Sequence, residues 1–418
     1  MAASLRRKNT KTAIVEVAAN LFRRRGFHET SMGDIAAAVG VSQPAVYLYF
    51  RSKQDLLREV IGRDQNEFIR NLRRETDSVN GWEKSLKTAV AIHTRLALGT
   101  DDPPRPRISR EQLAQWLLPR DVGAVRHGEQ RCHDQYAQIL IGGNAAGTFQ
   151  VKQLPTTVSA IWNMCEYSSR WFRTKGALVG KQLGQLHGQL ALRMARGHTS
   201  RSSVVPTLDR PSSHNRSVHL GAKQRILFSA GRLFSERGFK GASLAQIGQD
   251  VGISSPGLYW YFDSKQDLLF EFLLSSAADF TAEVKACVET ASHPRDRLCL
   301  LAYMHTRIRL ERQLLTGVYD AAVYSGSQLA GAIKGPKRRQ IQAIYKEYFR
   351  FAERIVEDGV SRGIFDVPHL AASVFAILNM CEYGNAWIGN ASSTKTTVVA
   401  KANSQLAVQM VGWRERAD

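Results

Sequence analysis

Apolar residues recur every three to four positions near the start of the chain, which is the spacing of one face of an α-helix. Ile14, Val17 and Phe22 carry this pattern within residues 11–25. Gly26 follows directly, and glycine is the usual residue at a left-handed helix end. The pattern therefore predicts a first helix that stops at Gly26.

Three further helices are predicted next, because a capping residue precedes each apolar run. Ser31 caps a helix that ends at Gly40, and Ser42 caps the following one, with Pro44 in a first turn where a missing N–H costs nothing. Ser52 caps a fourth, longer helix. Two helices joined by a tight turn with glycine are the plan of a helix-turn-helix unit.

The whole pattern occurs twice in the chain. Residues 13–57 and 225–269 are identical at 22 of 45 aligned positions, at a constant spacing of 212 residues. The motif Asn-Met-Cys-Glu-Tyr stands at 163–167 and again at 379–383, at a spacing of 216. A unit of about 200 residues is therefore duplicated, and the second copy has gained four residues between positions 307 and 359.

These observations predict an all-α chain of two tandem units, each with a helix-turn-helix head followed by a helical domain. Residues 199–218 are rich in Ser, Pro, Arg and His and lack apolar periodicity, so we expect them to be a linker. The expected boundaries are a first head at 8–68, a first helical domain at 69–198, a second head at 220–280 and a second helical domain at 281–418.

The heads carry a family resemblance. The run Tyr-Leu-Tyr-Phe-Arg-Ser-Lys-Gln-Asp-Leu-Leu at 47–57 resembles the DNA-binding domain of TetR-type transcriptional regulators, and residues 258–269 resemble it equally well. The resemblance implies a DNA-binding regulator, usually a repressor, that loses DNA affinity when a small molecule binds its helical domain. The Gly-x-x-x-Gly-x-Phe segment at 143–149 is similar to members that respond to acyl-CoA or steroid-CoA thioesters.

A recognition helix in the major groove reads base edges, while flanking groups hold phosphates. The expected base-facing residues are Gln43 and Ala45 in the first head and Ser255 and Gly257 in the second. The resemblance implies phosphate contacts by aromatic and basic side chains, namely Tyr47, Tyr49, Lys53, Tyr259, Tyr261 and Lys265. Serines at helix N-termini are expected to add to them, namely Ser31, Ser42, Ser243 and Ser254.

Some of these side chains have a structural alternative. Tyr47 could be a core aromatic residue, as Phe50 is expected to be, and Lys53 could be a solvated neighbour of a helix cap. The basic run 23–25 is expected to act as a general electrostatic face and not as a specific reader.

Charge indicates a polyanionic partner, since 57 basic and 37 acidic residues give the chain a net charge of +20. Residues 1–58 hold ten basic and four acidic residues, whereas residues 220–270 hold six and four. The first head should therefore carry more of the salt-dependent affinity for DNA.

The duplication has a consequence for symmetry. Family members bind as homodimers, whose identical recognition helices read a palindrome. Here two different heads lie on one chain, so we expect an intramolecular pseudo-dimer that reads an operator with two unlike half-sites. A homodimer of two chains with four heads is the alternative.

The helical domains are expected to bind a small hydrophobic or acyl-CoA-like effector. Candidate pocket residues are Trp116, Tyr136, Asn163, Trp171, Asn379 and Trp387. The alternative is that these side chains belong to an ordinary core, or that the two asparagines mark a seam between the copies.

Catalysis finds little support in the sequence. Cys132, His133 and Asp134 are adjacent, have no counterpart in the second copy, and cannot face one another on a helix. We expect no metal and no cofactor, no membrane span, and a cytoplasmic, nucleoid-associated protein. Two other classes remain open: an architectural or partner-binding DNA protein without an effector, and an enzyme that carries DNA-binding heads.

Overall fold

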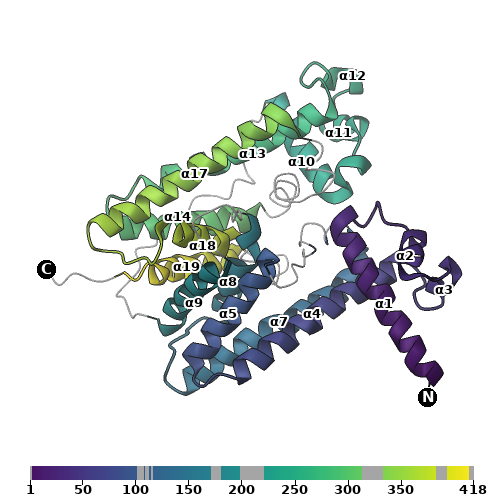
Figure 1. The fold of residues 1–418 in the computed structure, drawn as a ribbon. Coiled ribbons are helices and arrows are strands. Elements are labelled where there is room, and N and C mark those ends of the chain that lie inside the picture. Colours follow the sequence, from purple (N-terminus) through teal and green to yellow (C-terminus); the bar gives the residue numbers. More distant parts are fainter. Residues whose placement is uncertain are drawn as a thin grey trace. The chain divides into compact units, whose positions relative to one another are not determined.

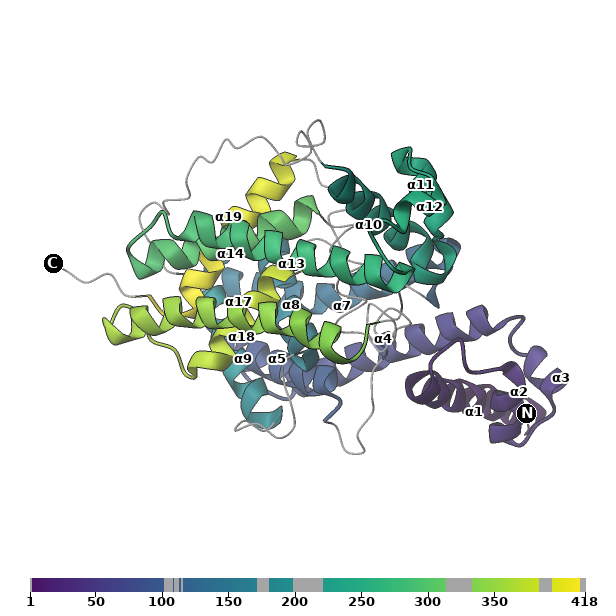
Figure 2. The ribbon, with the colours of Figure 1, turned by 90° about the horizontal axis from the view of Figure 1, so that it is seen from above.

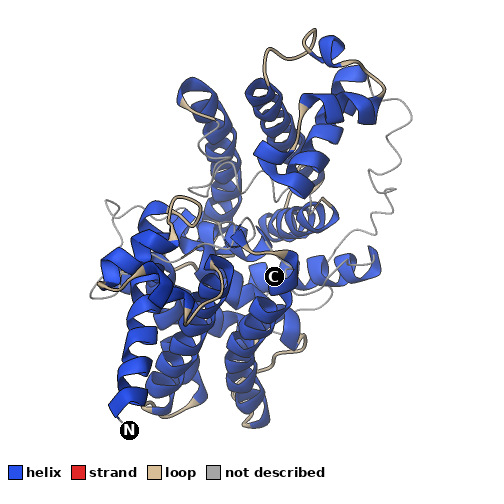
Figure 3. Cartoon of the chain, turned by 90° about the vertical axis from the view of Figure 1, so that its right-hand side faces the viewer, coloured by secondary structure: helices blue, strands red, loops and turns tan. Residues whose placement is uncertain are grey.

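The computed structural model describes residues 2–100, 108, 113, 116–170, 180–197, 221–312, 333–382 and 393–413. Within these ranges every regular element is a helix (Figure 3). The predicted all-α fold class is thereby confirmed. The predicted linker, 199–218, lies outside the described residues.

Each head consists of three helices and the start of a long fourth one (Figure 1). In the first head these are α1 (Ala2–Arg25), α2 (Met32–Val39), α3 (Gln43–Tyr47) and α4 (Lys53–Asp77). In the second they are α10 (Ala222–Gly241), α11 (Leu244–Val251), α12 (Ser255–Leu258) and α13 (Lys265–Val288). The first helix begins nine residues before the predicted start at position 11.

The helical domains follow the same order in both copies. The first contains α5 (Trp82–Leu98), α7 (Pro119–Ala145), α8 (Leu154–Glu166), the 3-10 helix η1 (Tyr167–Arg170) and α9 (Gly180–Arg196). The second contains α14 (Pro294–Glu311), α17 (Gly335–Ser361), α18 (Leu370–Glu382) and α19 (Ser393–Met410). The long helix of each head runs on beside this domain, α4 against α7 and α13 against α17 (Figures 1 and 2).

The chain divides into two compact units whose boundary differs from that of the copies. One unit consists of the described parts of residues 1–149 and 172–188, and the other of those of 150–171 and 189–418. The second unit thus combines α8 and the last turns of α9 with the whole second copy. Inside it, α8 packs against α18 and α19, so helices from the two copies are in direct contact.

Local capping explains where the short helices begin. The Ser31 hydroxyl accepts a hydrogen bond from the Asp34 N–H at 3.0 Å, and the Asp34 carboxylate accepts one from the Ser31 N–H at 2.7 Å. Ser42 caps α3 through the Ala45 N–H, and Gly40 ends α2 with a left-handed φ of 79°. These contacts confirm the two predicted caps and the predicted helix end at Gly40, and the reciprocal bonds of Ser31 and Asp34 form a capping box.

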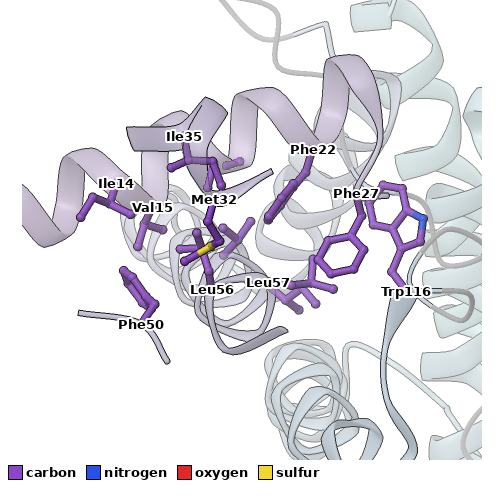
Figure 4. Packing of buried hydrophobic residues seen from close by; sticks show 14 of the residues in the cluster. Ile14, Val15, Phe22, Phe27, Met32, Ile35, Phe50, Leu56, Leu57 and Trp116 are labelled. Atoms are coloured by element: carbon purple, nitrogen blue, oxygen red, sulfur yellow. The ribbon is translucent and has the colours of Figure 1, made fainter. Parts of the chain in front are cut away.

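The first head is held together by one apolar cluster, shown in Figure 4. Ile14 and Phe22 from α1, Ile35 from α2, and Leu56 and Leu57 from α4 are completely buried in it. Phe50 is also buried, at 4% exposure, which confirms its predicted core position. Burial of this cluster fixes the angle between α2 and α3, and so determines which side chains face outward.

Candidate nucleic-acid interface

In the first head, the polar side of α3 faces solvent. Gln43 is exposed and Ala45 is half-buried. The next residue, Val46, is fully buried and anchors the helix in the core of the head. Tyr47 remains 47% exposed, so it is not a core residue, and Tyr49 is half-buried. Of these four predicted contact side chains, Gln43 and Tyr47 are thus accessible from solvent, and Ala45 and Tyr49 are partly accessible.

The second head repeats this surface with different side chains. Leu258 is the buried anchor, while Ser255 and Gly257 are half-buried at the positions equivalent to Gln43 and Ala45. Tyr259 and Tyr261 are 56% and 42% exposed. The two heads thus have the same framework, with unlike groups at the positions predicted to face bases.

Two exposed residues of this surface were missed by the sequence analysis. Leu48 is 74% exposed and Trp260, its equivalent in the second copy, is 89% exposed. A signal was available, because each stands between the two tyrosines expected to contact phosphate. Apolar side chains at such positions can contact thymine methyl groups, and the second head offers a much larger one.

The two lysines predicted to contact phosphate have partners inside the protein. Lys53 Nζ donates to the main-chain oxygens of Phe27 and Thr30 at 2.7 and 2.8 Å, and lies 4.4 Å from the centre of the Phe27 ring. Lys265 Nζ donates in the same way to Phe239 and Ala242, at 2.6 and 2.9 Å. Lys53 ties α4 to the loop after α1, and Lys265 ties α13 to the end of α10 and the residue that follows it; burial lowers the pKa of both lysines.

The helix N-termini expected to meet phosphate differ in charge. In the first head, hydrogen bonds from the Ser31 hydroxyl and N–H hold the pKa of Asp34 below its usual value, so a carboxylate stands beside Ser31. In the second head, the residue paired with Ser243 is the neutral Gln246, at 3.0 and 3.2 Å. A phosphate would meet repulsion at the first position but not at the second.

Ion pairs reduce the number of basic groups that DNA can use. Arg23 is bonded to both carboxylate oxygens of Asp64, at 2.6 and 2.8 Å. In the second head Arg232 pairs with Asp250 at 2.6 Å, and bonds from Ser229 and Arg232 lower the pKa of that carboxyl group. The basic excess of each head is therefore partly neutralised within the protein.

Trp116 lies in a different place from the expected effector pocket. Its ring stacks on Phe27 with 5.8 Å between centroids, inside the core of the first head (Figure 4). The Trp116 carbonyl accepts a hydrogen bond from Gln54 Nε2 at 2.7 Å. The physical reason is that Ile108, Leu113 and Leu117 also supply apolar side chains to this core, which no local pattern in the sequence indicated.

The other candidate pocket residues are deeply buried. Tyr136 is fully buried, and its hydroxyl lies 3.1 Å from His93 Nδ1 and donates to the Ala89 carbonyl. Asn163 on α8 and Asn379 on α18 are each 1% exposed. Trp171 and Trp387 lie outside the described residues.

The second helical domain repeats the histidine–tyrosine contact and adds a buried ion pair. His305 Nδ1 lies 3.0 Å from the Tyr348 hydroxyl. Arg309 forms an ion pair with the Glu382 carboxylate and donates to the Glu382 carbonyl at 3.2 Å; both side chains are about 95% buried. The first copy has Ala97 at the position of Arg309, so this pair is specific to the second copy.

Among the described residues, no group of three His, Cys, Asp or Glu side chains could hold a metal ion. No described helix is both long enough and apolar enough to cross a bilayer.

Two protein-family models match the chain, and each matches it twice. The model described as bacterial regulatory proteins, tetR family, covers residues 14–60 and 226–272. The model described as tetracyclin repressor-like, C-terminal domain, covers residues 85–195 and 291–411. The matches coincide with the heads and the helical domains of both copies.

Several curated proteins are similar to one copy. The fatty acid metabolism regulator protein of Bacillus subtilis is 22% identical over 192 residues, which are 45% of this chain and 93% of that protein. The transcriptional repressor KstR2 of Mycolicibacterium smegmatis is 25% identical over 189 residues, 43% of this chain and 87% of the repressor. The regulator HbdR of Aromatoleum is 32% identical over 77 residues, 18% of this chain and 34% of that regulator.

Two solved structures likewise match about half of this chain and nearly the whole of their own. The regulator FadR of Bacillus subtilis, solved in complex with stearoyl-CoA, covers 46% of this chain and 99% of its own, at 19% identity and a TM-score of 0.36. A tetR-family protein from Rhodococcus covers 47% and 100%, at 20% identity and a TM-score of 0.42.

Proposed function

Because this chain belongs to the tetR family of bacterial regulatory proteins and is a helix-turn-helix transcriptional regulator, we propose that it is a repressor that reads an asymmetric operator. One observation carries the proposal: the two heads share one framework but differ at the base-facing positions. Gln43 can form two hydrogen bonds to adenine, whereas Ser255 has a single hydroxyl group on a shorter side chain. Two such heads favour two unlike half-sites.

The contact between copies supports binding by a single chain. A helix-turn-helix regulator reads two half-sites when two heads are held by one dimer seam. Here α8 of the first copy packs on α18 of the second. We therefore propose that each chain forms its own pseudo-dimer and that one chain occupies one operator.

Exchange of the base-facing residues tests this proposal. Wild-type protein is expected to select an operator with two different halves from a random DNA library, at one chain per site by sedimentation. The variant Gln43→Ser/Ala45→Gly gives the first head the residues of the second, and should select two like half-sites. Affinity for the original operator should fall roughly 5- to 150-fold, the equivalent of about 1–3 kcal/mol per base contact.

Ser255→Gln is the matched control, and should alter the opposite half-site only. Gly257 stays unchanged in it, because a Cβ atom there would lie 2.9 Å from Ile253 Cγ2. Selection of a perfect palindrome by wild-type protein, with two chains per site, would contradict the proposal.

We propose an acyl-CoA-like thioester as the effector. The supporting observations are the similarity to the fatty acid metabolism regulator of Bacillus subtilis and the likeness of residues 143–149 to thioester-responsive members. In a thermal-shift measurement, a long-chain acyl-CoA at 100 times its Kd should stabilise its domain by about 2.7 kcal/mol. It should also release a bound operator. Free coenzyme A is the control, and an equal effect of the two compounds would refute recognition of the acyl chain.

A further inference from the structure

At the end of α9, an arginine of the first copy donates the polar contacts to the second copy. Arg193 lies in the last turns of this first-copy helix. Its guanidinium donates to the main-chain oxygen of Asp366 and, at 3.1 Å, to that of Met410, both in the second copy. Its Nη2 also lies 3.2 Å from the Asp366 carboxylate. The first copy thus supplies a cation and the second copy its anion.

The equivalent position on the other side of this seam has no such ion pair. The spacing of 216 residues makes Gln409 the counterpart of Arg193, and Gln150 the counterpart of Asp366. Main-chain bonds confirm this alignment, because Gln150 N–H donates to the Ala195 carbonyl at 2.9 Å and Asp366 N–H donates to the Val411 carbonyl at 2.8 Å. The buried Oε1 atom of Gln409 has no hydrogen-bond partner in the described part of the chain.

The charge beside this site also differs between the copies. Gly412 has a left-handed φ of 60°, and a Cβ atom there would lie 2.8 Å from Arg193 Nη1 and 3.0 Å from the Asp366 carbonyl oxygen. The first copy has a left-handed glycine in the same environment, Gly197, whose Cβ atom would lie 2.9 Å from the Gln150 carbonyl oxygen, and Arg196 directly precedes it. A second first-copy helix would therefore bring a like charge, that of Arg196, toward Arg193.

We infer that this seam selects its partner: the first copy pairs with a second copy in preference to another first copy. In a pairing of two first copies, Arg193 would face Gln150 and Arg196. In a pairing of two second copies, Asp366 would face Gln409. Only the unlike pairing forms the ion pair, and the partner that this surface fits is the chain's own second half. The inference rests on the pseudo-dimer part of the proposed function.

The test uses two full-length variants that change the ion pair in opposite ways. Gln150→Asp/Gln409→Arg adds a second pair to the seam, and Arg193→Gln/Asp366→Gln removes the existing one. In each variant, a seam of two identical copies and a seam of a first with a second copy contain equal numbers of ion pairs. Both variants therefore lose the preference of the first copy for the second. Rearrangement of two chains into one seam of two first copies and one seam of two second copies costs wild-type protein two surface pairs, and each variant should raise that rearrangement roughly 2- to 30-fold.

The rearrangement is measured on chains that carry a donor or an acceptor dye on the first copy; they are mixed, unfolded in urea and refolded together at micromolar concentration. Energy transfer in single particles then gives the fraction of particles in which two first copies share a seam. The exposed Lys401→Gln substitution is the charge control and should leave the fraction unchanged. If the variants shift the fraction in opposite directions, the pair acts only through stability, and that outcome or an absence of change overturns the inference. The operator experiment is independent, because selection of unlike half-sites by one chain does not depend on this result.

Discussion

Replacing Arg309 by methionine should lower the unfolding free energy of the second helical domain by about 3–5 kcal/mol. Arg309 and Glu382 are each only about 6% exposed, and the Glu382 carboxylate also lies 3.4 Å from His305 Nε2. Removal of the guanidinium takes the arginine cation away from a buried carboxylate. Such a group costs far more free energy than the intact pair contributes.

The measurement is urea unfolding combined with hydrogen exchange of α14 and α18, because a chain of several domains does not unfold in one step. The double variant Arg309→Met/Glu382→Leu should recover most of the loss, since apolar side chains of similar volume replace a buried pair at little cost. Ala97→Met is the control in the first copy, where the arginine is absent. Unchanged hydrogen exchange in Arg309→Met would show that the ion pair does not hold these helices together.

Acidification from pH 7 to pH 4 should destabilise the first helical domain by about 3 kcal/mol through one histidine, His187. Burial, and then the nearby His93, lower the pKa of His187 from 6.5 to about 3. Between these two values the unfolded chain holds a proton that the folded domain does not bind. Stability from this group is therefore complete above pH 6.5 and decreases as the pH falls toward 3.

The second copy provides the matched control for this histidine. His187 Nδ1 lies 3.0 Å from the Thr94 hydroxyl, and Asn403 Nδ2 donates to the equivalent Thr306 hydroxyl at 3.1 Å. His187→Asn should therefore keep the contact and remove the pH dependence, while Asn403→His should introduce it in the other copy. Urea midpoints of wild type and both variants, compared at pH 7, 5 and 4, provide the measurement. Parallel curves for wild type and His187→Asn would rule out this histidine as the cause.

Much of each head was predictable because its determinants are local. A serine hydroxyl reaches the N–H three residues later, and a glycine adopts a left-handed φ at its own position, so caps and turns can be located along the chain. Ser31, Gly40 and Ser42 accordingly begin or end helices where the sequence indicated. The fold class and the tandem arrangement followed from periodicity and from the repeat itself.

The partners of long polar side chains were not predictable, because they come from distant parts of the chain. Lys53 looks like a free cation in the sequence, yet its acceptors lie 23 and 26 residues earlier. Trp116 looks like a pocket aromatic residue, yet it stacks on Phe27 in the head. Leu48 and Trp260 were missed for a related reason: their exposures of 74% and 89% depend on how the short helices before them pack against the rest of the head.

The sequence by itself determined that this protein is all-helical and duplicated, with two helix-turn-helix heads of different sequence, because capping, periodicity and a repeat of 212 residues are all properties of the linear chain. Only the tertiary structure decided which charged side chains form ion pairs within the protein. Arg193 meets Asp366 across 173 positions and Arg309 meets Glu382 across 73, and such pairs form only when packing of apolar helix faces brings the segments together.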